Sequence, residues 1–370
     1  MKDGKIYSLH ISDIHFGKKD DLRLFKELGQ FNKKIHKEGE DIDVLFVQGD
    51  LYDRILKFNE IGGKLVLEFV TELCELSDKY DFELRIIKGT KTHDFNQLDV
   101  FKKFEGKHKN FRIITTVEVE ELFEDIFVLY LPEEYPENPE EYYAEYFNTE
   151  GKYDYIIGHG MIDFVAHVPE KAEDTGERFV RNAVTFKAKQ LSELCYGLIS
   201  FGHIHDRCDW KKKIYYTGSY SAFAFGEKKS KGYLECYYDT EELTFRVKHL
   251  VNKEAPSYIT VNIDEIHFES TEEKITFIKD LKDEYDFIKI KTNNDAENVD
   301  ILKQVVAADN DVKIDIKRNV VDEDKVDEKY LFIIRREYDL PTTLQKYMFL
   351  KYGKTIDLDI INDVIGETEE

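Results

Sequence analysis

Seven short runs of aliphatic and aromatic residues recur along the first part of the chain, and helical patterns separate several of them. The runs cover residues 6–12, 44–49, 84–89, 111–115, 126–131, 153–158 and 198–202. Several lack the alternation of polar and apolar residues that a strand with one solvent-exposed face shows, which indicates strands that are buried on both faces. The patterns at 22–37 and 64–80 predict helices between strands. Strands that alternate with helices predict a layered α/β fold.

The second half of the chain is organised differently. Strands predicted at 213–219, 232–239 and 243–250 follow one another closely, as in hairpins. Beyond Pro256, the predicted order is strand, helix, strand, helix and strand, at 258–263, 272–285, 287–292, 296–309 and 312–318. We therefore expect a domain at 1–254, a small α+β domain at 257–320, and a charged segment at 321–370 with a helix at 343–352.

The charge balance limits the function. The chain has 76 acidic and 53 basic side chains and a net charge of -23, which argues against a general nucleic-acid coat or a binder of anionic membranes. An enzyme that holds phosphates through metal ions remains compatible with this charge. No run approaches the roughly 20 apolar residues of a membrane span, the start MKDGKIYSLH has no apolar signal-peptide core, and the cysteines form no Cys-x-x-Cys pair. We expect a cytoplasmic protein without a membrane partner.

Histidines and aspartates follow the predicted strands. Five strand ends carry them, as Asp13 and His15, Asp50 and Asp53, His93 and Asp94, His159, and His203 and His205. Open α/β sheets build their sites in these loops. One such block alone is more often a cap or a hydrogen-bonded residue, but five blocks in order favour a metal centre.

The ligand types indicate which metal ions fit. Carboxylates and imidazoles without thiolates suit Mn²⁺, Fe²⁺ or Zn²⁺ in a catalytic site. A pair of ions about 3.5–4 Å apart shares a bridging carboxylate. Asp50 is the natural bridge in this set.

The order of these blocks resembles that of the calcineurin-like metallophosphoesterases. Within them, SDIHFGK at 12–18, GDLYDR at 49–54, GHIHDR at 202–207 and YTGSYSAFAFGE at 216–227 resemble the SbcD nucleases, the bacterial counterparts of the meiotic-recombination double-strand-break nuclease. The resemblance covers residues 5 to about 250, and the unit after Pro256 is similar to the DNA-binding capping domain of such chains. It implies a β-sandwich flanked by helices.

The family pattern assigns the residues as follows. One ion takes Asp13, His15, Asp50 and His205, and the second takes Asp50, His159 and His203. The family's third block reads Gly-Asn-His-Asp, in which the asparagine binds metal and the histidine is the catalytic acid. Here that block is Gly89-Thr90-Lys91-Thr92-His93-Asp94, two residues longer and without the asparagine.

This departure leaves the second ion one ligand short. We expect water, the Thr92 hydroxyl or His93 itself to complete it. His93 keeps the catalytic role, with Asp94 holding its ring. Asp53 is expected to orient a neighbouring ligand rather than to bind metal.

The resemblance implies a DNA exonuclease and endonuclease that uses two divalent ions, with Mn²⁺ as the first choice and Mg²⁺, Fe²⁺ and Zn²⁺ left open. It would act in double-strand-break processing, recombination or replication, in the cytoplasm of a cell or of a phage's host. Its expected partners are DNA, an SbcC-like ATPase that docks on the helix at 343–352, and a second copy of the chain. Helices 22–37 and 64–80 are candidates for the dimer interface. Two alternatives stay open: a stand-alone phosphatase or small-nucleotide phosphodiesterase, and a non-catalytic scaffold.

Local charge suggests where DNA would bind. Residues 203–231 hold seven basic and three acidic side chains, whereas residues 118–150 hold twelve acidic ones and no Lys or Arg. We expect the acidic stretch to be an exposed loop that faces away from the substrate. The candidate DNA contacts are Arg178, Arg181, Lys228 and Lys229.

Overall fold

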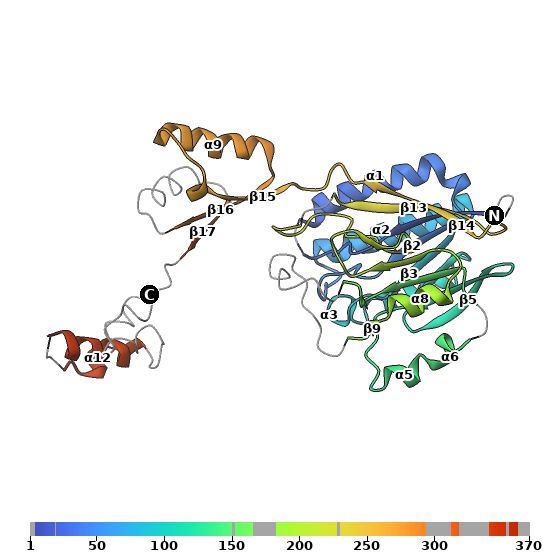
Figure 1. Ribbon diagram of the computed structural model, residues 1–370, viewed down its shortest axis with the longest axis horizontal. Helices are drawn as coiled ribbons and strands as arrows, with labels where there is room; N and C mark the ends of the chain where they lie inside the picture. The colour runs from blue at the N-terminus through green and yellow to red at the C-terminus, as the bar shows by residue number, and fades with distance from the viewer. Residues whose placement is uncertain are drawn as a thin grey trace. The chain divides into compact units, whose positions relative to one another are not determined.

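A computed structural model describes residues 4–18, 20–149, 152–165, 183–227, 230–293, 312–317, 340–352 and 355–361. The chain divides into two compact units (Figure 1). One holds Met1–Val261, Glu272–Lys289 and Asn310–Lys313, and the other holds Asn262–Thr271, Ile290–Asp309 and Ile314–Glu370. The predicted boundaries at 254 and 320 stay predictions.

The first six-stranded sheet has the order β14-β13-β1-β2-β3-β4. Its strands are β1 (Lys5–Ile11), β2 (Val44–Gln48), β3 (Glu83–Ile87), β4 (Phe111–Ile114), β13 (Gly232–Asp239) and β14 (Thr244–Val251). Strands β1 to β4 are parallel, and β13 joins β1 antiparallel and forms a hairpin with β14.

The second six-stranded sheet has the order β11-β12-β10-β7-β6-β5. Its strands are β5 (Glu118–Phe123), β6 (Ile126–Leu131), β7 (Tyr155–His159), β10 (Ile199–Gly202), β11 (Cys208–Trp210) and β12 (Ile214–Tyr216). The four inner strands are parallel, and the edge strands β5 and β11 are antiparallel to their neighbours.

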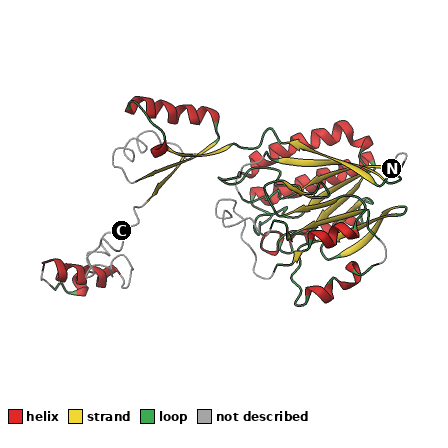
Figure 2. Ribbon diagram, viewed as in Figure 1, coloured by secondary structure: helices red, strands yellow, loops and turns green. Residues whose placement is uncertain are grey.

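The two sheets pack face to face, and helices cover their outer faces (Figure 2). Phe46, Tyr130 and Tyr155 belong to the apolar layer between the sheets. Helices α1 (Asp21–Glu38) and α2 (Ile61–Tyr80) pack on the first sheet, and α8 (Ala188–Leu194) packs on the second. The predicted layered α/β fold is confirmed.

Helix α1 shows how the sequence produces this packing. Asp20 caps its start by accepting a hydrogen bond from the Arg23 amide at 3.1 Å. Leu24, Leu28, Phe31 and Ile35 are all buried, and their spacing places them on one stripe of the helix.

Short elements complete the larger unit. They are η1 (Gly39–Asp41), α3 (Lys91–Asp94), η2 (Gln97–Phe101), α4 (Lys102–Glu105), α5 (Pro139–Tyr142), α6 (Ala144–Phe147), and the paired strands β8 (Met161–Ile162) and β9 (Thr185–Phe186).

The two sheets approach each other closely where their parallel strands end. A Cβ on Gly49, whose φ is +78°, would lie 2.2 Å from Nδ1 of His159 on the other sheet. A Cβ on Gly202 would likewise lie 2.2 Å from the carbonyl oxygen of Gln48. Only glycine fits at these two positions, because the strand ends of both sheets lie in direct contact there.

Later in the sequence, a three-stranded sheet has the order β15-β16-β17. Its strands are β15 (Tyr258–Asn262), β16 (Phe287–Asn293) and β17 (Val312–Lys317), accompanied by η3 (Ile263–Glu265) and α9 (Thr271–Glu284). These agree with the predicted strands and first helix, whereas the helix predicted at 296–309 lies outside the described residues. Helix α12 (Leu340–Tyr352) contains the predicted helix at 343–352.

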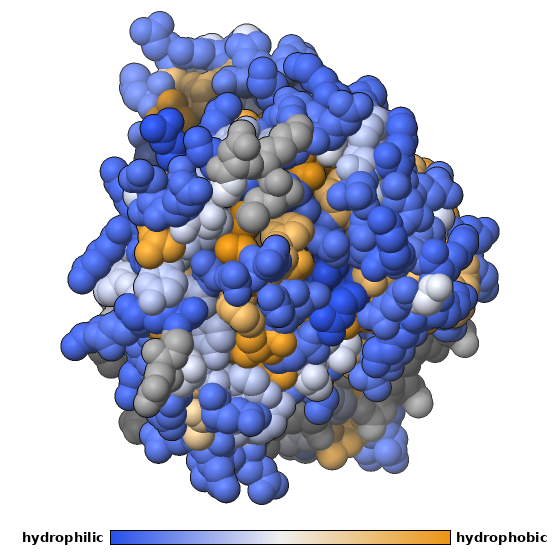
Figure 3. All heavy atoms as spheres, turned by 90° about the vertical axis from the view of Figure 1, so that its right-hand side faces the viewer, coloured by the Kyte–Doolittle hydropathy of each residue, from blue (hydrophilic) through white to orange (hydrophobic). Residues whose placement is uncertain are grey.

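One face of the molecule is mainly polar. Viewed from the right-hand side of Figure 1, hydrophobic side chains form only small separate patches on a hydrophilic face (Figure 3). In the described part of the chain, no helix combines the length and apolar character that crossing a membrane requires.

Candidate metal centre

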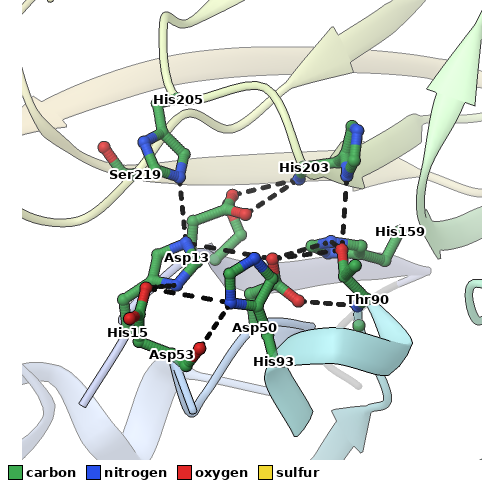
Figure 4. Close-up of polar contacts among 12 residues, drawn as sticks. Asp13, His15, Asp50, Asp53, Thr90, His93, His159, His203, His205 and Ser219 are labelled. Atoms are coloured by element: carbon green, nitrogen blue, oxygen red, sulfur yellow. Dashed lines mark hydrogen bonds and ion pairs between the residues drawn. The ribbon is translucent and has the colours of Figure 1, made fainter. Parts of the chain in front are cut away.

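The six predicted metal ligands lie together at the ends of parallel strands from both sheets (Figure 4). They follow β1 and β2 of the first sheet and lie at the ends of β7 and β10 of the second. None is more than 6% exposed, and they are Asp13, His15, Asp50, His159, His203 and His205.

Asp13, His15 and His205 form one group of donor atoms within 4.8 Å of one another. The Nε2 atoms of His15 and His205 face each other at 2.9 Å. Two imidazoles and a carboxylate at this spacing could hold a divalent ion.

A second set of donors adjoins the first. Asp13, Asp50 and His159 form one group, and Glu133, His159 and His203 form another. Oδ2 of Asp50 lies 3.8 Å from Nε2 of His15 and 3.3 Å from Nε2 of His159. Asp50 therefore stands between the two sets, where a bridging carboxylate would be needed.

Glu133 was not predicted as part of the site. It follows β6 after Pro132 and is 5% exposed, with Oε2 3.4 Å from Nδ1 of His203. The expectation that the acidic stretch is an exposed loop facing away from the site is wrong here. Its place just after a predicted strand is the sequence signal for it, although Glu133 is neither a histidine nor an aspartate.

Thr90, rather than Thr92, faces the candidate centre. Its hydroxyl lies 3.0 Å from Glu133 Oε2, 3.3 Å from Asp50 Oδ2 and 3.3 Å from His159 Nε2. Thr92 is exposed. The expectation for Thr92 is therefore wrong, because the two extra residues begin the short helix α3 and turn Thr92 outward.

His93 forms a further donor group with His15 and Asp50, and a residue other than the expected Asp94 contacts its ring. His15 and His93 have ring centroids 4.9 Å apart, and Nδ1 of His93 lies 2.7 Å from the carbonyl oxygen of Asp53. Asp94 is fully buried and accepts hydrogen bonds from the amides of Gly89, Tyr52 and Asp50, at 2.7, 3.0 and 3.2 Å. The expectation that Asp94 orients His93 is corrected, because its carboxylate is directed to the backbone of two loops.

Asp53 lies next to a ligand candidate, as expected. Its Oδ1 is 3.3 Å from Nδ1 of His15 and 3.2 Å from Nζ of Lys18. Contact with Nδ1 leaves the opposite ring nitrogen of His15 directed at His205.

The backbone at the site is unusual. Asp13, His15, Asp50 and His203 have φ values of 51°, 55°, 50° and 99°. Non-glycine residues rarely adopt this left-handed region, although Asp and His tolerate it better than most. Such a conformation costs on the order of 1 kcal/mol or more, and it is commonly found at functional sites.

In the metal-free protein, burial and neighbouring charges shift the pKa values of histidines at the site. Burial lowers the pKa of His15 to about 3, so this ring is neutral. Burial alone would also lower the pKa of His159, but Asp50 raises it well above its usual value. A proton on His159 therefore offsets carboxylate charge in the metal-free protein, and a divalent ion would replace it.

The TGS…FGE segment supports His205. The Ser219 amide donates to the His205 carbonyl at 3.1 Å, and Glu227 Oε1 lies 3.2 Å from its Nδ1. Lys231 is 5% exposed and pairs with Glu227 at 3.0 Å. Burial would raise the pKa of Glu227, but His205 and Lys231 lower it to about 2. Lys231 thus belongs to the support of the site rather than to a DNA-binding surface.

The candidate DNA contacts have a different outcome. Arg178, Arg181, Lys228 and Lys229 lie outside the described residues. Lys211, Lys212 and Lys213 precede β12, which is parallel to β10. These three lysines therefore lie at the opposite end of the strands from His203, away from the candidate centre.

Comparisons with known proteins do not identify the chain. No family model matches it, and no curated protein does. A crystal structure of TT1561 of Thermus thermophilus is similar over 66% of this chain and 98% of that chain, with 13% identity and a TM-score of 0.38. A second crystal structure has the same identity and TM-score and is covered to 99%. Likeness at this level carries no argument, so the resemblance to SbcD nucleases stays a prediction.

Proposed function

We propose that this protein is a metal-dependent DNA nuclease of the SbcD type. The observation that supports it is the position of Asp50, which belongs to two adjoining donor groups, one with Asp13 and His159 and the other with His15 and His93. Two ions in such an arrangement suit the hydrolysis of phosphodiesters.

The residues fit a two-ion centre, for which Mn²⁺ is the proposed metal. Asp13, His15, Asp50 and His205 would hold one ion, and Asp50, His159 and His203 the other. When bound, the ions lower the pKa of a water and stabilise the charge that develops on the phosphate. Neutral imidazoles and carboxylates without thiolates favour Mn²⁺, Fe²⁺ or Zn²⁺ over Ca²⁺.

The protein's own residues would position ligands and move a proton. With Nδ1 of His93 donating to the Asp53 carbonyl, the doubly protonated ring could give its Nε2 proton to the leaving oxygen and remain as the neutral Nδ1–H form. The Asp53 and Glu227 carboxylates contact the Nδ1 atoms of His15 and His205 and so orient both rings.

The proposed partners are DNA, a second copy of the chain and an SbcC-like ATPase. Leu22 on α1, and Ile61 and Leu67 on α2, are exposed apolar side chains, which supports these helices as a dimer interface. On α12, Leu344 and Phe349 are exposed and support its docking on the ATPase. A chain that omits residues after 339 should fold but no longer co-purify with that partner.

One assay tests the activity. The full chain is incubated with Mn²⁺ and, in separate reactions, with linear duplex DNA, single-stranded DNA and a generic phosphate ester. The proposal requires DNA cleavage that EDTA abolishes and that Asp50→Asn reduces by at least about 100-fold. Turnover of the ester alone would favour a phosphatase, and inactivity even with the ATPase would favour a scaffold.

A further inference from the structure

The second donor set contains a carboxylate that the family pattern does not supply. Oε2 of Glu133 lies 3.4 Å from Nδ1 of His203 and 3.9 Å from Nε2 of His159. Ligand atoms bound at about 2.0–2.2 Å to one ion are about 3.0–3.5 Å apart when their bond angles are near 90–109°. Glu133 therefore stands close to the separation that two ligands of one ion require.

Among the described residues, the groups of opposite charge that can face Glu133 are the imidazoles of His159 and His203. The Glu133 side chain is 5% exposed, and no Lys or Arg among the described residues pairs with it. Tyr135 donates its hydroxyl hydrogen to Oε1, which leaves Oε2 directed at the two imidazoles and Thr90. A buried carboxylate is stabilised by pairing with a positive charge or by binding a metal ion.

Thr90 stands where the expected asparagine is absent. It follows Gly89 at the end of β3, and its hydroxyl lies 3.3 Å from both Asp50 Oδ2 and His159 Nε2. Its donation to Glu133 Oε2 at 3.0 Å ties the loop after β3 to the loop after β6.

We propose that Glu133 is an anionic ligand of the second ion and replaces the missing asparagine, with Thr90 orienting it. This inference rests on the proposed function only in requiring that second ion. Asp13, Asp50 and Glu133 then set three negative charges against four positive charges from two divalent ions. The centre carries a net charge of about +1 instead of the +2 that a neutral amide would leave. It should bind its second ion more tightly than an amide-containing site would.

Titration of the metal-free full chain with Mn²⁺ by calorimetry tests this. The wild type should bind two ions, and Glu133→Gln should weaken one of them by about 100-fold and the other by less than about threefold. Glu134→Gln is the matched control, because Glu134 accepts hydrogen bonds from the Val117 amide and the Tyr142 hydroxyl, both at 2.8 Å, and no candidate ligand. It should bind both ions as the wild type does.

Thermal melting separates a ligand from a merely structural residue. In EDTA, Glu133→Gln gives the reference Tm, because the loss of the carboxylate's contacts with Tyr135, Thr90 and the two imidazoles changes stability there whether or not Glu133 is a ligand. With Mn²⁺, it should gain less in Tm than the wild type, because the stabilisation from binding to the folded state grows with the logarithm of the affinity. A Glu133→Gln chain that keeps the full Mn²⁺ shift, whatever its Tm in EDTA, would overturn the proposal.

The remaining outcomes separate this inference from the proposed function. Two ions bound with unchanged affinity by Glu133→Gln, or one ion bound by the wild type, would overturn the ligand assignment even if DNA is cleaved. Loss of one ion in Glu133→Gln would support it even if no DNA is cleaved, and only the nuclease proposal would then fail.

Discussion

Replacing Asp94 by alanine tests whether this residue supports the loops rather than the catalytic histidine. Its carboxylate accepts hydrogen bonds from three amides, those of Asp50, Tyr52 and Gly89. A buried donor without an acceptor costs about 1–3 kcal/mol, so three of them would cost at least about 3 kcal/mol.

Removing the carboxylate also removes a buried charge, which reduces this cost. Burial and the charge of Asp50 raise the pKa of Asp94 to about 7, so the ionised carboxylate is itself disfavoured at pH 8. We therefore expect Asp94→Ala to lower the free energy of unfolding by about 3 kcal/mol, the lower end of the hydrogen-bond sum. In Asp94→Asn, an amide oxygen in place of Oδ2 keeps the bonds from Asp50 and Gly89, and the expected loss is about 1 kcal/mol.

Urea denaturation at pH 8 in EDTA, followed by circular dichroism, measures these differences. Asp99→Ala is the control, because the Asp99 side chain is 52% exposed and, in the described part of the chain, its ion-pair partner is Lys102. The change should be within about 0.5 kcal/mol. An Asp94→Ala chain as stable as the wild type, but unable to cleave DNA, would refute the structural role and restore Asp94 as the partner of His93.

Three further predictions follow from the site and from the layer between the sheets. His93→Asn should lower kcat for DNA cleavage by at least about 100-fold, while the Mn²⁺ affinity measured by calorimetry should change less than about threefold. Full activity in this variant would exclude His93 as the catalytic acid. Mn²⁺ affinity should fall as the pH falls, because Asp50 raises the pKa of His159 and the ion must displace the proton on that ring. Calorimetry in buffers of different ionisation enthalpy should show this proton release, and its absence would contradict His159 as a ligand. Burial lowers the pKa of His10 to about 3, so this ring stays neutral in the folded chain while the unfolded chain protonates below about 6.5. Stability should therefore fall as the pH falls below about 6.5, and His10→Gln should reduce this slope by about 1.4 kcal/mol per pH unit, as acid denaturation can check.

Much of the centre could be predicted because the parallel strands end where the two sheets meet. The aspartates and histidines after β1, β2, β7 and β10 needed only the positions of buried strands to be recognised. The choice between Thr90 and Thr92 could not be made in this way, since it depends on where α3 begins.

Other parts depended on direction and on contacts between distant segments. Lys211 to Lys213 flank the site motifs in sequence, but the parallel alignment of β12 with β10 places them at the far end of the strands. The three amides that Asp94 binds belong to loops whose separation no sequence pattern gives.

The candidate ligands come from both sheets, and this has a consequence for how the chain folds. Asp13 and His205 are separated by 192 positions (205 − 13), and they can share an ion only after the two sheets have docked. The ion would then act as a long-range cross-link of the folded sandwich, comparable to a disulfide in the span that it closes. Mn²⁺ binding during refolding would consequently report the docking of the sheets, a step that secondary-structure signals do not detect.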